Sequence, residues 1–200
     1  MTEIALAVVR QLLLFTALLL PLQILLPAQP QQPLLRKGLS VDLLHCCLNP
    51  FLINIGAALL LGALAALLER ILPAGLRKIL QAQPFALQLA EIFVASEVLG
   101  YFAHRLSHAV PALWRFHAVH HSTEQLDFLA AHRQHPIEAV VLLGVSNLPV
   151  LVLGFDTTPL LTFIVVQKLY TAFVHANVRI GYGPLEGLLA SPRFHHWHHH

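Results

Sequence analysis

The chain has 200 residues, of which 56% are hydrophobic and 11% are charged, and its net charge is +2 when the histidines are neutral. Soluble domains usually have about 25% charged residues, so this composition indicates that lipid is the main solvent of the chain. The small and dispersed positive charge excludes a phosphate-binding face, and with it a nucleic-acid function. The two cysteines, Cys46 and Cys47, are adjacent and cannot supply the spaced pairs of a disulfide framework or a zinc ribbon.

The first half of the chain contains two apolar runs that predict membrane-spanning helices. Residues 4–26 contain Arg10 and Pro21 but have the length of about 20 residues that a span requires, and we expect a retained anchor rather than a cleaved signal peptide. The run of glutamine and proline at 28–33 ends this helix. Residues 51–68 contain no charge and predict the second span.

The second half alternates apolar and polar segments. Residues 69–84 contain basic residues among leucines at helical spacing, which predicts a short helix at the membrane interface. Residues 85–102 form a further apolar run that leads directly into the first histidines. Residues 139–155 and 160–174 predict a helical hairpin with a turn at 154–159.

These runs predict an all-α, multi-pass transmembrane bundle of about four to five spans. The hairpin ends at His135 and His175 would emerge on the side of the bilayer that holds the polar segment 104–135. Basic residues are in excess near the histidines, which predicts that the histidines face the cytoplasm. These basic residues are Arg105, Arg115, Arg133, Arg179 and Arg193. We expect two domains, the N-terminal helices with the interfacial segment over 1–84 and a histidine-bearing domain over 85–200.

Histidine is the unusual component, because 14 occur and all except His45 lie at residue 104 or later. The motif HRLSH at 104–108 places two rings at i, i+4 on one helical face, and the pattern HxxHH occurs at 117–121 and again at 195–199. His175 adds one ring at the end of the hairpin. The candidate metal ligands are therefore His104, His108, His117, His120, His121, His175, His195, His198 and His199. We expect His45, His132, His196 and His200 to be non-ligands.

Nine imidazoles imply at least two metal ions, because one ion seldom takes more than six ligands. With no thiolate in the set, iron, zinc, copper and nickel are all compatible. Zinc does not change oxidation state, and a structural zinc needs only four ligands. Iron fits best a large nitrogen-rich site that keeps open positions.

Several polar residues are candidates for orienting the ligands. Glu97 and Tyr101 lie on the helical stripe of the first motif, so Glu97 could accept a hydrogen bond from a ligand's second ring nitrogen, or it could pair with a buried arginine. His135 and Glu138 begin the hairpin and could support the site without binding metal. Asn177 follows His175 closely and is a further candidate.

Together these motifs resemble the fatty acid hydroxylase and sterol desaturase superfamily of integral-membrane di-iron oxygenases. The resemblance covers residues 85–200 and is carried by YFAHRLSH (101–108), LWRFHAVHHSTEQLD (113–127), RQHPIE (133–138), FVHANV (173–178) and SPRFHHWHH (191–199). It implies that the nine histidines bind two iron ions. Members of the superfamily continue past the last motif with a further polar segment, so we expect the domain to be truncated at its C-terminus.

The resemblance also implies cofactors, partners and a location. Members use O2 and electrons from NAD(P)H, delivered through a cytochrome b5-like or ferredoxin-like protein with its reductase. They act on sterols, fatty acyl chains and related lipids in lipid biosynthesis, and they lie in the bacterial inner membrane or the endoplasmic reticulum. The sequence leaves hydroxylation and desaturation open as alternatives.

Two other functions compete with the oxygenase. A zinc-dependent membrane hydrolase would need fewer histidines and a carboxylate base, as in HExxH, which the sequence lacks. A metal transporter, or a metal-binding membrane protein without enzymatic activity, would have ionisable residues along a path through several spans. Here the histidines gather beyond the helix ends, which favours the oxygenase.

Overall fold

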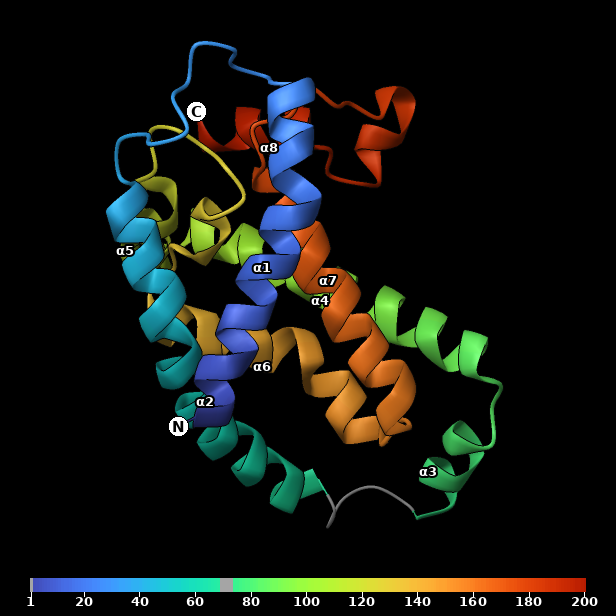
Figure 1. Ribbon diagram of the computed structural model, residues 1–200. Coiled ribbons are helices and arrows are strands. Elements are labelled where there is room, and N and C mark those ends of the chain that lie inside the picture. The colour runs from blue at the N-terminus through green and yellow to red at the C-terminus, as the bar shows by residue number, and fades with distance from the viewer. Residues whose placement is uncertain (1, 69–73) are drawn as a thin grey trace. The chain divides into compact units, whose positions relative to one another are not determined.

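The computed structural model describes residues 2–68 and 74–200, and all of its regular elements in these ranges are helical. The helices are α1 (Thr2–Leu25), α2 (Leu39–Leu68), α3 (Ala74–Gln81), α4 (Phe85–Ala109), α5 (Pro111–His121), α6 (Pro136–Leu153), α7 (Thr157–His175) and α8 (Pro192–His199), with short 3-10 turns η1 (Ala130–His132) and η2 (Gly183–Gly187) (Figure 1). No β-strand occurs in the described ranges. The predicted all-α class is confirmed.

Four of these helices are long and apolar enough to cross a membrane. They are α1, α2 over Leu39–Leu60, α4 and α7, and α6 has a shorter apolar stretch over Pro136–Asn147. Much of their apolar surface faces outward, since Leu13, Leu59 and Val94 have exposed fractions of 66%, 72% and 66%. Such surface is compatible with lipid and costly in water. The chain is a multi-pass membrane protein, and the prediction of about four to five spans is confirmed.

Helix α2 begins earlier than the sequence suggested, at Leu39 instead of residue 51. Asp42 lies in its first turn and is completely buried, because Arg36 and Arg133 both bond to its carboxylate. The charge therefore does not interrupt the helix, and Pro50 is also accommodated within it. The predicted interfacial helix corresponds to α3, while Glu69 and Arg70 lie outside the described residues.

The chain forms two compact units. The first unit comprises Met1–Phe51, Ala118–His135 and Lys168–His200, and the second comprises Leu52–His117 and Pro136–Gln167. Each is described by itself below. The predicted domain division into 1–84 and 85–200 stays a prediction.

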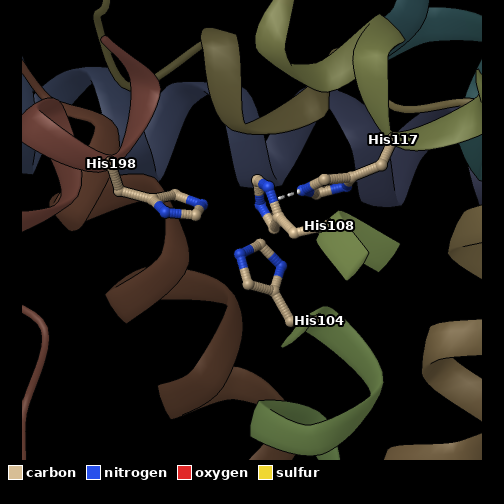
Figure 2. Close-up of side chains that lie close together, drawn as sticks. All are labelled: His104, His108, His117 and His198. Atoms are coloured by element: carbon tan, nitrogen blue, oxygen red, sulfur yellow. Dashed lines mark hydrogen bonds between the residues drawn. The ribbon is translucent and has the colours of Figure 1, made fainter. Parts of the chain in front are cut away.

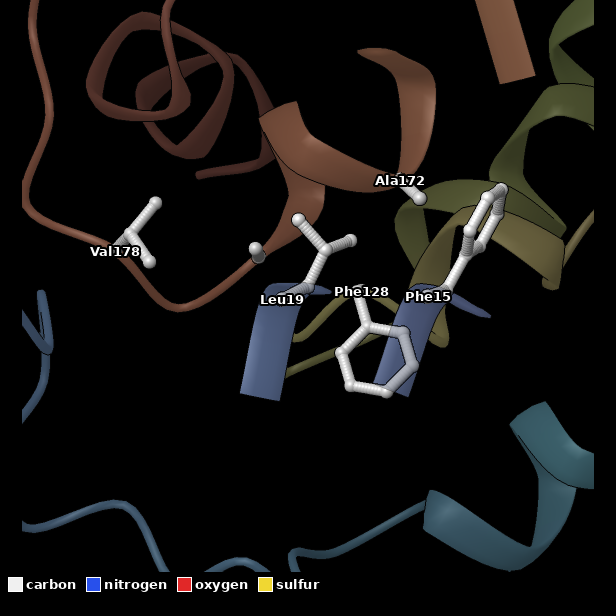
Figure 3. Packing of buried hydrophobic residues seen from close by; sticks show 6 residues of the cluster. Phe15, Leu19, Phe128, Ala172 and Val178 are labelled. Carbon is white, nitrogen blue, oxygen red and sulfur yellow. The ribbon is translucent and has the colours of Figure 1, made fainter. Parts of the chain in front are cut away.

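The core of the first unit joins α1 to the end of α7 and to the loop after α5. Phe15 and Leu19 pack against Phe128, Ala172 and Val178, and all five are buried (Figure 3). One turn beyond Leu19, the buried side chain of Gln23 accepts hydrogen bonds from the backbone N–H groups of Phe128 (3.2 Å) and Asn177 (3.0 Å). The amide thus satisfies backbone donors in an otherwise apolar region.

The core of the second unit packs α4 against the α6–α7 turn. Ile92 and Phe163 are fully buried, and Phe93 meets Phe163 edge to face with ring centroids 4.9 Å apart. The turn is fixed by Gln88, whose Oε1 accepts from the Asp156 backbone N–H at 3.0 Å. The predicted turn between the two hairpin helices occupies residues 154–156.

Gly154 is required at this turn, because its φ is +72° and a Cβ there would lie 2.5 Å from Nε of Arg77. We expect Gly154→Ala to lower the free energy of unfolding by about 1–2 kcal/mol, the cost of placing a side chain in the left-handed region. Thermal unfolding in detergent measures this change. Gly75→Ala is the control, since a Cβ at Gly75 meets nothing within 4 Å, and an equal loss in both variants would contradict the argument.

Candidate metal centre

The first histidine group lies in the second unit. His104 and His108 come from the last turns of α4, and His117 comes from α5. Helix α4 ends at Ala109 because Val110 precedes a proline and takes an extended conformation, which lets α5 start in a new direction. One nitrogen from each of the three rings lies within 4.8 Å of the others, and Nε2 of His108 and Nε2 of His117 are 3.0 Å apart (Figure 2).

Glu138 forms a hydrogen bond with His117. Its Oε1 lies 2.5 Å from Nδ1 of His117, and both residues are buried. A carboxylate at this distance accepts the Nδ1 proton, so that the Nε2 lone pair of His117 faces His108. This is the usual arrangement of a metal-binding histidine and its orienting carboxylate.

The second histidine group lies in the first unit and combines His120 of α5, His175 of α7, and His195 and His199 of α8. Their Nε2 atoms form a series of close approaches. His120 and His175 are 3.1 Å apart, His175 and His195 are 2.9 Å apart, and His195 and His199 are 3.1 Å apart. Imidazole nitrogens bound at about 2.1 Å to one ion lie roughly 3 Å apart when they occupy neighbouring octahedral positions.

Backbone carbonyls fix the tautomer of two of these rings. Nδ1 of His120 donates to the Arg133 carbonyl at 3.0 Å, and Nδ1 of His175 donates to the Thr171 carbonyl at 2.7 Å. In the neutral rings both Nε2 atoms therefore carry lone pairs, which face each other without a proton between them. A shared cation satisfies both, whereas an additional proton would create a buried imidazolium.

The imidazole rings of His195 and His199, on α8, favour the neutral form that metal binding requires. Burial lowers the pKa of His195 well below its ordinary value of 6.5, and the neighbouring histidines lower it further. Burial also lowers the pKa of His199, with added effects of His175 and His121. A neutral imidazole is the ligand form of histidine, so both rings can bind a metal without releasing a proton at neutral pH.

Local capping positions α8. Ser191 precedes the helix, accepts a hydrogen bond from the Phe194 backbone N–H at 3.1 Å and donates one to Glu186 at 2.6 Å. Pro192 occupies the first helical position, where a missing N–H costs nothing. Glu186 also binds Arg193 at 3.0 Å. The sequence SPR at 191–193 therefore starts the helix that contains the HxxHH motif at 195–199.

His121 and His198, which were also predicted as ligands, lie beside the second group in the first unit. The ring of His121 stacks on His199 with centroids 4.4 Å apart, and His198 lies 4.8 Å from His121 by the same measure. Within the part of the chain that the structure describes, neither belongs to the four-nitrogen set of His120, His175, His195 and His199. Their role as ligands stays a prediction, as do the other seven assignments.

The predicted orienting residues on α4 have partners of their own. Glu97 is exposed and accepts a hydrogen bond from Gln167 at 3.2 Å. Tyr101 is exposed and its hydroxyl accepts from Arg105 at 2.9 Å. Neither hydrogen bond involves a histidine, so the proposed support of the first motif by these two residues stays a prediction.

The remaining candidates lie elsewhere. His135 is half-buried immediately before α6. Asn177 is buried and fastens the connection after α1, since its Oδ1 accepts from the Gln29 N–H at 2.9 Å and its Nδ2 donates to the Gln29 carbonyl at 3.2 Å. His196, expected to be a non-ligand, bonds through Nε2 to the Ala176 carbonyl at 3.0 Å.

A polar cavity of about 290 Å³ opens beside the second group. Its lining includes His121, His199, Asn177, Thr123 and Glu124. Two of the lining residues contain a buried atom, Oγ1 of Thr123 and Nδ1 of His199, that has no hydrogen-bond partner among the described residues. Buried polar atoms without a partner therefore lie next to the second group.

Sequence reasoning missed buried polar residues of α2 that bond to the segment 132–134. Asp42 and Asn49 are 0% and 6% exposed, although both lie in a helix that is otherwise apolar. An aspartate within an apolar run was the available signal, since a buried carboxylate requires a cationic partner. The partner, Arg133, lies far away in the sequence.

Fold and site together define a multi-pass, all-helical membrane protein with two groups of histidines that can bind metal. The family model described as "Fatty acid hydroxylase" matches residues 89–200, which is more than half of the chain. The chain therefore belongs to the fatty acid hydroxylase family, and the predicted membership is confirmed.

Curated relatives support the same class. Ornithine lipid hydroxylase OlsE of Rhizobium tropici is 38% identical over 120 residues, which cover 58% of this chain and 35% of that protein. Alkylglycerol monooxygenases of Xenopus tropicalis and Homo sapiens are 31% and 30% identical, with 50% of this chain and 22% of each relative covered. The chain thus spans about a third or less of these relatives, and no solved structure matches it. Their names agree with the predicted class of lipid oxidoreductase.

Glu138→Gln should weaken metal binding at the first group by about 10- to 100-fold, because the charged acceptor for His117 Nδ1 is lost. A Co(II) titration of the metal-free protein measures the affinity. Glu91→Gln provides the control, since Glu91 lies on α4, the helix of His104 and His108, but accepts a hydrogen bond from Gln83. Unchanged affinity in the Glu138 variant would contradict an orienting role for this carboxylate.

His132 makes the stability of the metal-free protein depend on pH. Its ring stacks on Phe15, and burial, with a smaller effect of Lys168, lowers its pKa from 6.5 to about 4. Between these two pH values the unfolded chain binds a proton that the folded chain does not. The free energy of unfolding therefore falls as the pH drops through this window, by up to about 1.4 kcal/mol per pH unit for this residue.

We expect His132→Gln to reduce the slope of the pH dependence of stability between pH 6.5 and pH 4, with the other buried histidines contributing the remainder. Urea unfolding in detergent at several pH values measures the slope. His200→Gln, at an exposed position, should leave the slope as it is in the wild-type protein. A wild-type slope in the His132 variant would contradict the argument.

Proposed function

We propose that this chain forms the metal-binding, membrane-embedded part of an iron-dependent oxygenase that hydroxylates a membrane lipid. The observation that carries the proposal is the set of facing Nε2 lone pairs in the second histidine group, where His120 and His175 are 3.1 Å apart with both Nδ1 protons committed to carbonyls. An all-nitrogen donor set suits iron among the redox-active metals. Family membership supports the same choice.

Two iron ions are proposed, one for each histidine group. The first group supplies His104, His108 and His117, and the second supplies His120, His175, His195 and His199. His121 and His198 complete the nine ligands. Helix α5 serves both groups, because it contains His117 and, three residues later, His120.

When bound, the iron ions supply the electrons that activate O2. In the balanced reaction one oxygen atom enters a C–H bond of the lipid, the other leaves as water, and a donor outside this chain provides two electrons and two protons. The residues of this chain hold the rings in place. Glu138 and the carbonyls of Arg133 and Thr171 retain the Nδ1 protons and keep the Nε2 lone pairs directed at the metal.

The proposed substrate is a membrane lipid. The relatives named above are a hydroxylase of ornithine lipid and monooxygenases of alkylglycerol, and these names favour hydroxylation over desaturation. Apolar residues near the second group provide a surface that a lipid can approach. Leu188 and Trp197, on either side of the start of α8, are 87% and 76% exposed. An aromatic side chain such as that of Trp197 is typical of the membrane interface.

The cytoplasmic orientation and the electron donor belong to the same proposal. Exposed arginines lie close to the histidines, which favours the cytoplasmic face by the positive-inside rule. They are Arg105, Arg115, Arg179 and Arg193. On that face, electrons from NAD(P)H would arrive through a cytochrome b5-like or ferredoxin-like protein with its reductase.

The purified protein should contain about two irons per chain and should transfer ¹⁸O from ¹⁸O2 to a lipid when a reductant is supplied. His120→Ala should lose iron and turnover, because it removes a buried ligand of the second group. His45→Ala should retain both, since His45 lies on α2 and bonds only to Asn49 among the contacts that the structure describes. Metal analysis and mass spectrometry of the lipid products measure these outcomes.

Two results would overturn the proposal. One zinc per chain with ¹⁸O taken from water would indicate a hydrolase. Equal loss of iron and turnover in the His120 and His45 variants would contradict the assignment of His120 as a ligand and His45 as a non-ligand.

A further inference from the structure

Four buried charges connect the start of α2 to the loop that follows α5. Arg36 binds Asp127 through Nε at 2.7 Å and Nη2 at 2.5 Å, and it also binds Asp42. Asp42 in turn binds Nε of Arg133. The four residues are between 0% and 7% exposed, and their charges sum to zero. A neutral and fully paired network of this kind is tolerated in an environment of low polarity.

Asn49 holds the same loop at a second point. It lies two helical turns after Asp42 on the same face of α2, and its Nδ2 donates to the carbonyls of His132 at 3.1 Å and of Gln134 at 2.8 Å. These two carbonyls flank Arg133. The backbone on each side of Arg133 is therefore bonded to α2, and the Arg133 side chain is bonded to it as well.

The residue held in this way supplies the acceptor for a histidine of the second group. The carbonyl of Arg133 accepts the Nδ1 proton of His120 at 3.0 Å, which leaves Nε2 of His120 facing His175. The Arg133 guanidinium makes a further bond to the Gly38 carbonyl at 2.9 Å, next to the start of α2. Movement of the loop would turn this acceptor away from His120.

We infer that Asp42 and Asn49 are positioning residues for the second histidine group, acting through the Arg133 carbonyl on His120. This inference rests on the proposed function, because it assumes that the group holds a metal ion. Helix α2 lies outside residues 89–200, the part of the chain that the family model matches. The structure thus assigns to the N-terminal part a role in setting the geometry of a site whose ligands all lie later in the sequence.

The test is an anaerobic Co(II) titration of the metal-free protein, followed by the d–d absorption of the bound ion. The wild-type protein should bind two equivalents. Asp42→Asn and Asn49→Ala should each bind one equivalent with wild-type affinity and the other about 10- to 100-fold more weakly, the usual effect of losing support for a ligand. Asn49→Ala changes no charge, so it still tests the positioning role if Asp42→Asn does not fold.

Lys37→Gln is the matched control. Lys37 pairs with Glu124 at 2.8 Å and connects the same two segments of the chain, but the two side chains are 74% and 67% exposed. Exposed ion pairs contribute little. This variant should bind both equivalents as the wild-type protein does.

A double variant tests the route through Arg133. Arg133→Gln keeps the carbonyl but loses the bond to Asp42. If Asp42 acts through this bond, the two substitutions should not add to each other. The affinity of the double variant Asp42→Asn/Arg133→Gln for the more weakly bound Co(II) should then be no lower than that of the more impaired single variant. Losses that multiply would contradict the route.

The remaining outcomes separate the two proposals. A wild-type protein that binds fewer than two equivalents would contradict the proposed function. Two equivalents in the wild type, with unchanged affinities in both α2 variants, would contradict only the positioning role. Equal weakening of both equivalents, or failure of both variants to fold, would assign Asp42 and Asn49 to general stability and would also contradict it.

Discussion

Imidazole lone pairs brought together without protons between them are the constraint on which the site depends. His120 and His175 each give their Nδ1 proton to a backbone carbonyl, so their Nε2 atoms meet as two acceptors 3.1 Å apart. Desolvation opposes the alternative of a buried imidazolium, and it lowers the pKa of His195 in the same group. A cation resolves the conflict. The fold is arranged to hold these rings close despite their mutual repulsion.

The apolar helices supply the stiffness that this arrangement needs. Their outward surface is satisfied by lipid, so the polar groups that they carry must be satisfied within the protein. Gln23, Gln88 and Asn49 each bond to backbone groups that have left regular helical hydrogen bonding. The same principle explains why Asp42 is buried beside arginines. Polar side chains within the spans therefore serve mainly to fix loops, and the loops in turn hold the histidines.

The sequence was sufficient for the class of fold and for the family, since hydropathy and histidine spacing depend on local pattern. It was insufficient for the partners of those residues. Helical periodicity placed Glu97 on the stripe of the first motif, yet Glu97 bonds to Gln167, and the carboxylate that bonds to His117 is that of Glu138, which was a candidate without an assigned partner. The sequence predicted no role for Asp42, because its partner Arg133 is 91 residues away. Spacing shows which residues share one helix face, but contacts between helices depend on tertiary packing.

The hexapeptide RQHPIE, residues 133–138, contains no residue of either histidine group, yet it supplies hydrogen-bond acceptors to both. Its first residue offers a carbonyl to His120 and its last offers a carboxylate to His117. Between them Pro136 begins α6 and fixes the spacing of the two acceptors along the chain. An insertion or deletion of one residue here would change the number of residues between the two acceptors, so the length of this segment matters as well as its composition.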